Sequence, residues 1–257
     1  MQPLRVHYLQ TDLHWEDFQA NRTHLEPKLS TLRGHSDLIL LPEMFGSGFT
    51  MQPEQVAQEM SGEAVSWMQD MAKELDAAIM GSLVIKEDQN YFNRLICAES
   101  DGSVSFYDKR HLFSYGGEDK SYTPGRHHLI LTIKGWRILG LICYDLRFPV
   151  WSRNVWNYDL LVYVANWPVT RIDAWQTLLK ARAIENQSYV VGVNRVGSDP
   201  LDINYPGMSA VYDMAGNLLH ESGSGEEIGA VTLQYDTLHD YRNHFSFLHD
   251  MDRFQIG

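Results

Sequence analysis

The sequence reads Ile-Leu-Gly-Leu-Ile-Cys-Tyr-Asp over residues 138–145. Its first five residues form an apolar run, which predicts a β-strand covered on both faces, and the run ends at Cys143. In open α/β sheets, reactive groups collect just beyond the carboxyl ends of strands. Cys143 therefore stands where a nucleophile is expected. The alternative is that it is a small core residue, a common role for a free cysteine and the one expected of Cys97.

Two further strands are predicted to end in reactive side chains. Glu43 follows the apolar run 38–41, and Lys109 follows the segment 104–108. A lysine beside a thiol favours the thiolate, and a carboxylate can take the thiol proton. The three side chains could meet in one crevice, although a strand-capping glutamate and an exposed lysine would look the same in sequence.

Strands and helices alternate along the rest of the chain. Strands are predicted at 4–8, 79–85, 160–165, 189–193, 209–213 and 228–233, and helices at 65–75 and 172–186. A helix over 15–32 contains Pro27, which predicts a kink or a split. Hairpin turns are predicted at Asp101-Gly102 and Lys134-Gly135. The alternation predicts an α/β fold with a mixed sheet, in one domain over residues 1–257.

Residues 235–257 are rich in aromatic and histidine side chains but show no clear periodicity. We expect them to form a C-terminal tail that packs on a partner subunit.

The composition excludes several classes of protein. The chain has 257 residues, of which 33 are acidic and 21 basic, giving a net charge of −12. Such a surface repels phosphate backbones, so no nucleic-acid partner is expected. No apolar run reaches the length of about 20 residues that spans a bilayer, and the N-terminus lacks signal-peptide features. Two cysteines make no disulfide framework, so we expect a cytoplasmic protein without a membrane partner.

The sequence predicts no metal and no cofactor. None of its 11 histidines lies in a recognised ligand motif such as H-E-x-x-H, and His239, His244 and His249 share neither a helix face nor a strand face. Walker A, G-x-G-x-x-G and G-x-S-x-G motifs are also missing from the sequence.

Three segments together resemble the signature blocks of the nitrilase superfamily of carbon-nitrogen hydrolases. They are LPEMF at 41–45, YDKRHLF at 107–113 and GLICYDLRFP at 140–149, and they occur in the family's order. Within the superfamily the chain is similar to the ω-amidase branch, and to its enterobacterial 2-oxoglutaramate amidase type. The resemblance implies an αββα sandwich, commonly paired across a homodimer as αββααββα.

The resemblance also implies catalytic roles. Cys143 would be the nucleophile that forms a thioester, Glu43 the general base, and Lys109, with the backbone N–H of Tyr144, the oxyanion stabiliser. Glu118 would match the family's second glutamate, which positions the lysine, with Asp119 as the competing choice one position away.

The expected substrate is the terminal amide of 2-oxoglutaramate or 2-oxosuccinamate, hydrolysed to the 2-oxo acid and ammonia. Trp167 and Arg171 follow the strand that ends at Asn166, so they are expected on the rim of the crevice. An arginine suits a substrate carboxylate, although a solvated surface arginine is equally compatible with this position. Phe45 and Tyr144 are expected to line the pocket.

Three alternatives stay open at this point. The same three catalytic residues would serve a hydrolase of a nitrile, an N-carbamoyl amino acid or another small amide. A thiol redox sensor would use Cys143 differently, but the sequence shows no C-x-x-C motif. A catalytically inactive binding protein is the third alternative, and the intact set of reactive residues argues against it.

Overall fold

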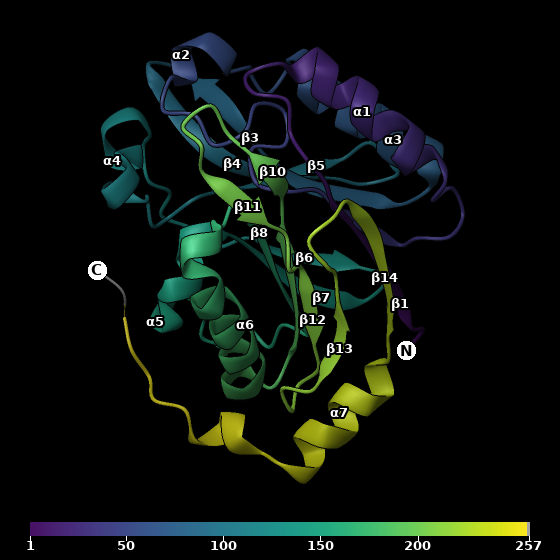
Figure 1. Ribbon diagram of the computed structural model, residues 1–257. Coiled ribbons are helices and arrows are strands. Elements are labelled where there is room, and N and C mark those ends of the chain that lie inside the picture. Colours follow the sequence, from purple (N-terminus) through teal and green to yellow (C-terminus); the bar gives the residue numbers. More distant parts are fainter. Residues whose placement is uncertain (256–257) are drawn as a thin grey trace.

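Two six-stranded mixed sheets form the centre of the structure, a computed structural model that describes residues 1–255 (Figure 1). The first sheet runs in the order β14 (Glu227–Leu233), β1 (Leu4–Gln10), β2 (Leu38–Leu40), β3 (Ala78–Glu87), β4 (Asn90–Ala98) and β5 (Val104–Asp108). The second runs in the order β13 (Leu218–Glu221), β12 (Ala210–Tyr212), β9 (Tyr189–Asn194), β8 (Leu160–Ala165), β7 (Trp136–Ile142) and β6 (Ile130–Ile133). A small pair, β10 (Val196–Ser198) and β11 (Asn204–Pro206), stands apart from both.

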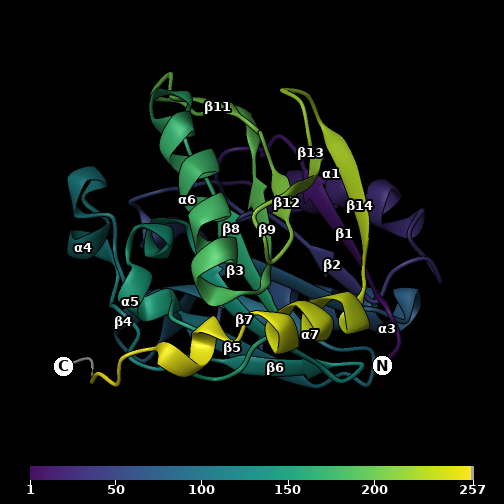
Figure 2. The same cartoon turned by 90° about the horizontal axis from the view of Figure 1, so that it is seen from below.

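Helices cover the outer face of each sheet. The helices α1 (Phe18–Ser30) and α3 (Glu63–Leu75) lie over the first sheet, and α6 (Ile172–Asn186) lies over the second (Figures 1 and 2). Shorter helices are α2 (Pro53–Val56), α4 (Glu118–Ser121) and α5 (Pro149–Ser152). The expected αββα sandwich and the helices predicted at 65–75 and 172–186 are confirmed.

The alternation of side chains along β2 explains its continuous apolar run. Leu38 and Leu40 point into the core between the two sheets, whereas Ile39 and Leu41 point into the core beneath α1 and α3. Successive side chains of a strand face opposite sides, so a strand buried on both sides carries no polar residue in its middle. The inter-sheet core is therefore what joins the two halves of the sandwich.

The structure confirms one local prediction, the hairpin turn at Lys134-Gly135, and contradicts another, the split of the first helix at Pro27. Lys134 and Gly135 join β6 to β7 with φ angles of 49° and 87°, as the predicted hairpin turn requires. The helix α1 begins only at Phe18 and is one element, so the split expected at Pro27 is wrong. Pro27 lies in the last turn of α1, where a proline removes a single backbone hydrogen bond.

The C-terminal segment departs from the expected tail, because Tyr235–His244 form the helix α7 and Phe247–Asp250 a 3-10 helix, η4. Arg242 of α7 donates to the backbone oxygens of Tyr158 (2.6 Å) and Gln187 (2.7 Å). Only Leu238 of α7 is buried. The helix is thus held on the second sheet by these hydrogen bonds together with Leu238, Tyr235 and Tyr241, which pack against the core.

Parallel pairing decides where the site forms. In the first sheet β1, β2 and β3 run parallel, and in the second β7, β8 and β9 do. Their carboxyl ends therefore lie at common edges, where Glu43, Cys143 and Asn166 follow β2, β7 and β8. None of the helices within residues 1–255 has the length and apolar character needed to span a membrane.

Gly192 of β9 lets α6 approach the second sheet closely. A Cβ atom at Gly192 would lie 2.4 Å from Leu179 Cδ1 and 2.7 Å from Trp175 Cζ2, both on α6. We expect Gly192→Ala to lower the free energy of unfolding by about 1–3 kcal/mol, the usual cost of overpacking. Gly225→Ala, where no atom lies within 4 Å, should change it by less than about 0.5 kcal/mol. Urea denaturation compares the two, and equal stabilities would contradict this account of the helix packing.

Candidate active site

Cys143 lies at a sharp turn between β7 and the 3-10 helix η2 (Cys143–Arg147). Its φ of 43° is in the left-handed region, which a residue with a Cβ atom adopts only under constraint. Asp145 supplies that constraint, because its carboxylate accepts hydrogen bonds from the backbone N–H of Ile142 (3.1 Å) and of His111 (3.0 Å) and from the Tyr107 hydroxyl (2.8 Å). The turn thus presents the thiol at the end of the strand.

Glu43, Lys109 and Glu118 form a buried cluster of charges beside this turn. Lys109 Nζ lies 2.8 Å from Glu43 Oε1 and 3.0 and 2.9 Å from the two carboxylate oxygens of Glu118. All three side chains are fully buried, whereas Asp119 is exposed. The structure therefore brings the lysine together with Glu118 and not with its neighbour.

Two asparagines that the sequence reasoning did not assign complete the shell around Glu43. Asn93 Nδ2 donates to Glu43 Oε1 (2.8 Å), and the backbone N–H of Asn166 donates to Glu43 Oε2 (2.8 Å). Asn166 directly follows β8, the same strand-end position that drew attention to Cys143 and Lys109. Its position at the end of a strand was therefore the feature of the sequence that could have identified Asn166 as a site residue. Asn93 lies inside β4, and no sequence pattern marks it.

The charges and the burial set the protonation of the site at rest. Burial alone would lower the pKa of Lys109, but the carboxylates of Glu118 and Glu43 raise it above its ordinary value. Burial raises the pKa of Glu118 against the opposing charge of Lys109. Burial also raises the pKa of the Cys143 thiol well above its ordinary value; Glu43 raises it further, while Lys109 opposes the shift. The lysine is therefore charged and the cysteine is a neutral thiol.

This result changes one expectation from the sequence. The lysine does favour the thiolate, but burial and the two carboxylates outweigh it. Ionisation of Cys143 therefore needs a base at the moment of attack. Glu43 is placed for this, since its carboxylate is near enough to the thiol to raise the pKa of Cys143.

The thiol opens onto a cavity of about 360 Å³. The residues around it include Phe49, Met51, Phe113, Cys143, Tyr144, Arg147, Asn166, Trp167, Arg171, Leu201, Ile203 and Tyr205. Tyr144, Trp167 and Arg171 thus line the cavity as expected from the sequence. The backbone N–H of Tyr144 lies in the first turn of η2, where N–H groups have no acceptor within the helix.

Phe45 does not line this cavity, so that expectation is corrected. Its fully buried ring lies in the core under the helices, 5.8 Å from the ring of Trp67 on α3. A Cβ atom at Gly81 would lie 2.9 Å from Phe45 Cδ1, so the glycine leaves room for this ring on the helix side of the sheet.

Two arginines hold their guanidinium groups against aromatic rings of the cavity. Arg147 lies 5.1 Å above the ring of Trp167, and Arg171 lies 5.0 Å above that of Phe113. Within residues 1–255, neither guanidinium group forms an ion pair with an acidic side chain. A cation that is fixed in place but unpaired suits an anionic ligand.

In the part of the chain that the structure describes, no cluster of three or more histidine, cysteine, aspartate or glutamate side chains has a geometry that could hold a metal ion.

Comparison with known proteins gives matches over the whole chain. The carbon-nitrogen hydrolase profile matches residues 5–243. The chain is 43% identical to Omega-amidase YafV of Yersinia enterocolitica over 100% of both proteins, and 33% identical to 2-oxoglutaramate amidase of Bacillus subtilis over 86% of each. It is also similar to the crystal structure of XC1258 from Xanthomonas campestris, a CN-hydrolase superfamily protein with an arsenic adduct in its active site. That comparison has a TM-score of 0.98 at 42% identity and covers 100% of both chains.

The family profile spans most of the chain, and Glu43, Lys109 and Cys143 all lie within the matched residues. The chain therefore belongs to the carbon-nitrogen hydrolase family.

Proposed function

We propose that this protein is a cysteine-dependent amidase that hydrolyses the terminal amide of 2-oxoglutaramate, and also that of 2-oxosuccinamate, to the 2-oxo acid and ammonia. The observation that carries the proposal is the buried cluster of Glu43, Lys109 and Glu118 beside the Cys143 thiol. The names of the relatives, Omega-amidase and 2-oxoglutaramate amidase, support the same substrate class.

In the first half of the reaction, Cys143 Sγ attacks the amide carbonyl carbon while Glu43 takes the thiol proton. The carbonyl oxygen becomes negative and is stabilised by Lys109 Nζ and the backbone N–H of Tyr144. One such donor is typically worth about 10²–10³ in rate. Glu43 then gives its proton to the nitrogen, ammonia leaves, and a thioester remains on Cys143.

In the second half, Glu43 takes a proton from water as the water oxygen attacks the thioester carbonyl carbon. The C–S bond then breaks, the acid leaves, and Glu43 returns the proton to Cys143 Sγ. Glu118 acts as a positioning residue, since both of its carboxylate oxygens accept hydrogen bonds from Lys109 Nζ. It fixes the ammonium without touching the substrate. Because the cluster contains two carboxylates and one ammonium, it keeps a base available throughout.

The arginines of the cavity explain how a protein of net charge −12 can bind an anionic substrate. Long-range repulsion is screened beyond about 8 Å, so local cations decide binding. Arg171 is our candidate for the substrate carboxylate, because a guanidinium group donates two parallel hydrogen bonds to a carboxylate. Its contact with Phe113 holds it at the wall of the cavity.

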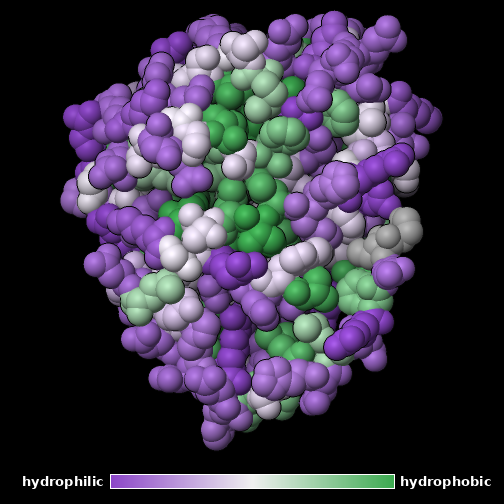
Figure 3. All heavy atoms as spheres, turned by 180° about the vertical axis from the view of Figure 1, so that it is seen from behind, coloured by the Kyte–Doolittle hydropathy of each residue, from purple (hydrophilic) through white to green (hydrophobic). Residues whose placement is uncertain are grey.

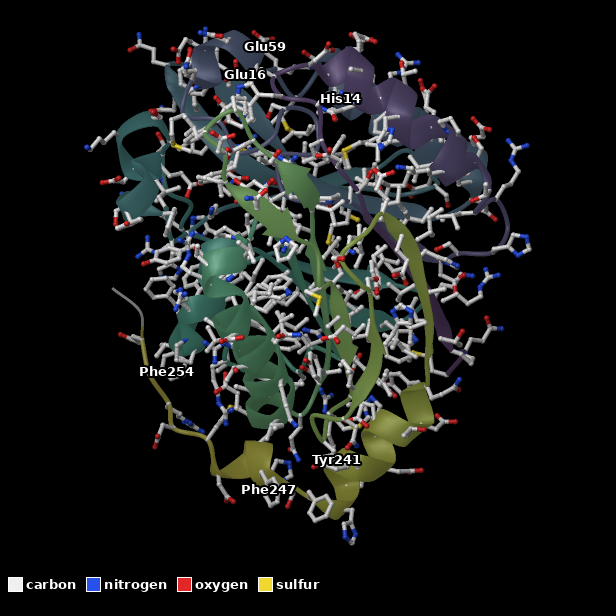
Figure 4. All side chains as sticks on the ribbon, viewed as in Figure 1. His14, Glu16, Glu59, Tyr241, Phe247 and Phe254 are labelled. Carbon is white, nitrogen blue, oxygen red and sulfur yellow. The ribbon has the colours of Figure 1, made fainter. Side chains whose placement is uncertain are left out.

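We also propose that the protein is a cytoplasmic homodimer. Several large hydrophobic side chains of α5, α6 and the C-terminal segment are exposed, with Val150 at 53%, Ile184 at 47% and Phe247 at 59%. Phe247 and Phe254 lie at the outer edge of the molecule (Figure 4), and hydrophobic residues also gather in a band on the face seen from behind (Figure 3). Exposed apolar groups of this kind are typical of subunit contacts.

The thiol assignment predicts a selective reaction with iodoacetamide. Cys143 lines the cavity, whereas Cys97 is buried in the inter-sheet core, so peptide mass mapping should find Cys143 modified first. The raised pKa of the Cys143 thiol leaves only a small thiolate fraction at pH 7, which grows as the pH rises toward that pKa. The alkylation rate should therefore keep increasing between pH 7 and 9. A plateau below pH 8 would show a preformed thiolate instead.

The substrate assignment predicts that kcat/KM for ammonia release is higher with 2-oxoglutaramate than with butyronitrile or an N-carbamoyl amino acid. Arg171→Gln should raise KM for 2-oxoglutaramate by about 10- to 100-fold, since a hydrogen bond to a charged group is worth about 1.5–3 kcal/mol. Hydrolysis of the neutral butyramide should change by less than about threefold. Arg33→Gln serves as the control, because Arg33 is exposed and lies far from Arg171 in the sequence. Equal losses on the charged and neutral amides would rule out a carboxylate contact.

The dimer predicts a solution mass of twice 29.6 kDa by size-exclusion chromatography with light scattering. Val150→Asp together with Ile184→Asp should shift the protein to the monomer, because two unpaired charges would be buried in the contact. A monomeric native protein would contradict the proposal.

A further inference from the structure

Asn166 makes contacts that hold its side chain in one orientation beside Glu43. Its Nδ2 donates to the backbone oxygen of Glu43 at 2.7 Å and lies 3.4 Å from Glu43 Oε2. Both partner atoms are acceptors, so only the NH₂ end of the amide can face them. Exchange of the nitrogen and the oxygen of Asn166 is therefore excluded by chemistry, and Oδ1 points away from Glu43.

This oxygen has no partner. Asn166 is only 6% exposed and lines the cavity next to Cys143, yet its Oδ1 is buried and accepts no hydrogen bond from any residue in the range 1–255. The other asparagine at Glu43 differs, because Asn93 Oδ1 accepts from Ser82 Oγ at 2.9 Å. A buried acceptor without a donor costs about 1–3 kcal/mol, so such an atom in a reactive site calls for a ligand.

The ligand must place a hydrogen-bond donor within reach of Asn166 Oδ1. Glu43 has to return a proton to the nitrogen of the amide, so that nitrogen must come to the carboxylate of Glu43. Asn166 is joined to this carboxylate through its backbone N–H and its side chain. Because Asn166 is anchored to this carboxylate, its side chain lies near the place to which the leaving nitrogen must come.

We propose that Asn166 Oδ1 accepts a hydrogen bond from the NH₂ group of the substrate amide and, after ammonia has left, from the water that takes its place. The assignment rests on the proposed amidase function. As the C–N bond breaks, the nitrogen keeps its two hydrogens, gains the proton that Glu43 took from the thiol, and leaves as ammonia. Water then enters from the same side, with one hydrogen toward Asn166 and the other toward Glu43.

The contact would make Asn166 a specificity residue for primary amides. An ester has no hydrogen on its leaving oxygen, and a nitrile has none on its nitrogen, so either would leave Oδ1 unpaired. Sites built to pair a polar group discriminate strongly against analogues that lack it.

The test compares an amide with an ester of the same acid. Succinamate and monomethyl succinate give the same thioester, and kcat/KM for each reports only the steps up to loss of the leaving group. Asn166→Ala should lower the amide-to-ester ratio of kcat/KM by about tenfold, the loss of one hydrogen bond of roughly 1.4 kcal/mol. Asn93→Ala removes a different donor to Glu43 and should slow both substrates alike, leaving the ratio unchanged.

A second variant keeps the test valid if Asn166→Ala does not fold. Asn166→Leu fills a similar volume without an acceptor and should show the same fall in the ratio. If the ratio stays constant in Asn166→Ala or Asn166→Leu, Asn166 only positions Glu43 and the assignment is overturned. Butyramide and methyl butyrate repeat the measurement without a carboxylate. Failure of the native protein on 2-oxoglutaramate alone would thus overturn the proposed substrate and leave the Asn166 assignment standing.

Discussion

The buried ammonium group of Lys109 is the constraint on which the site depends. A cation taken out of water is costly unless carboxylates surround it, and here Glu43 and Glu118 both lie within hydrogen-bond distance. Two buried carboxylates need further donors in turn, which Asn93 and Asn166 supply to Glu43 and the backbone N–H of Phe113 supplies to Glu118 (2.6 Å). Loss of any one member would leave a buried charge unpaired, so these strand ends and the start of α4 have to meet in one arrangement.

That arrangement also links the two sheets. Glu43 follows a strand of the first sheet, whereas Cys143 and Asn166 follow strands of the second. Their relative positions are therefore fixed by the inter-sheet core, in which Leu40 and Met80 of the first sheet pack with Ile142 and Val164 of the second. Protein interiors are close-packed and resist deformation, so this core holds base and nucleophile in register. Packing far from the thiol consequently contributes to the geometry of the reaction.

The sequence was most informative where a strand end carries a reactive side chain. Glu43, Lys109 and Cys143 all stand just beyond strands, and the topology of the strands brings such positions to one edge. The sequence did not show which way a side chain points where both sides of the sheet are buried. Phe45, in the turn after β2, points to the helix layer, and Asn93 points from the middle of β4 into the site. Period-two alternation carries no signal when both faces are apolar. The helix α7 was not predicted for a related reason, since it fully buries only one side chain, Leu238, and so shows little hydrophobic periodicity.

The chemistry of the thiol follows from the same balance of charges. A lone lysine beside a cysteine would stabilise a resting thiolate, which reacts with many electrophiles. Here the two carboxylates that keep Lys109 charged also raise the pKa of the Cys143 thiol, so in the proposed reaction the nucleophile forms only as Glu43 takes its proton. Glu43 can act in this way because Asn166 and Asn93 hold its carboxylate in place without neutralising it. The polar shell that pairs the buried charges is therefore also what couples deprotonation of the thiol to attack on a bound substrate.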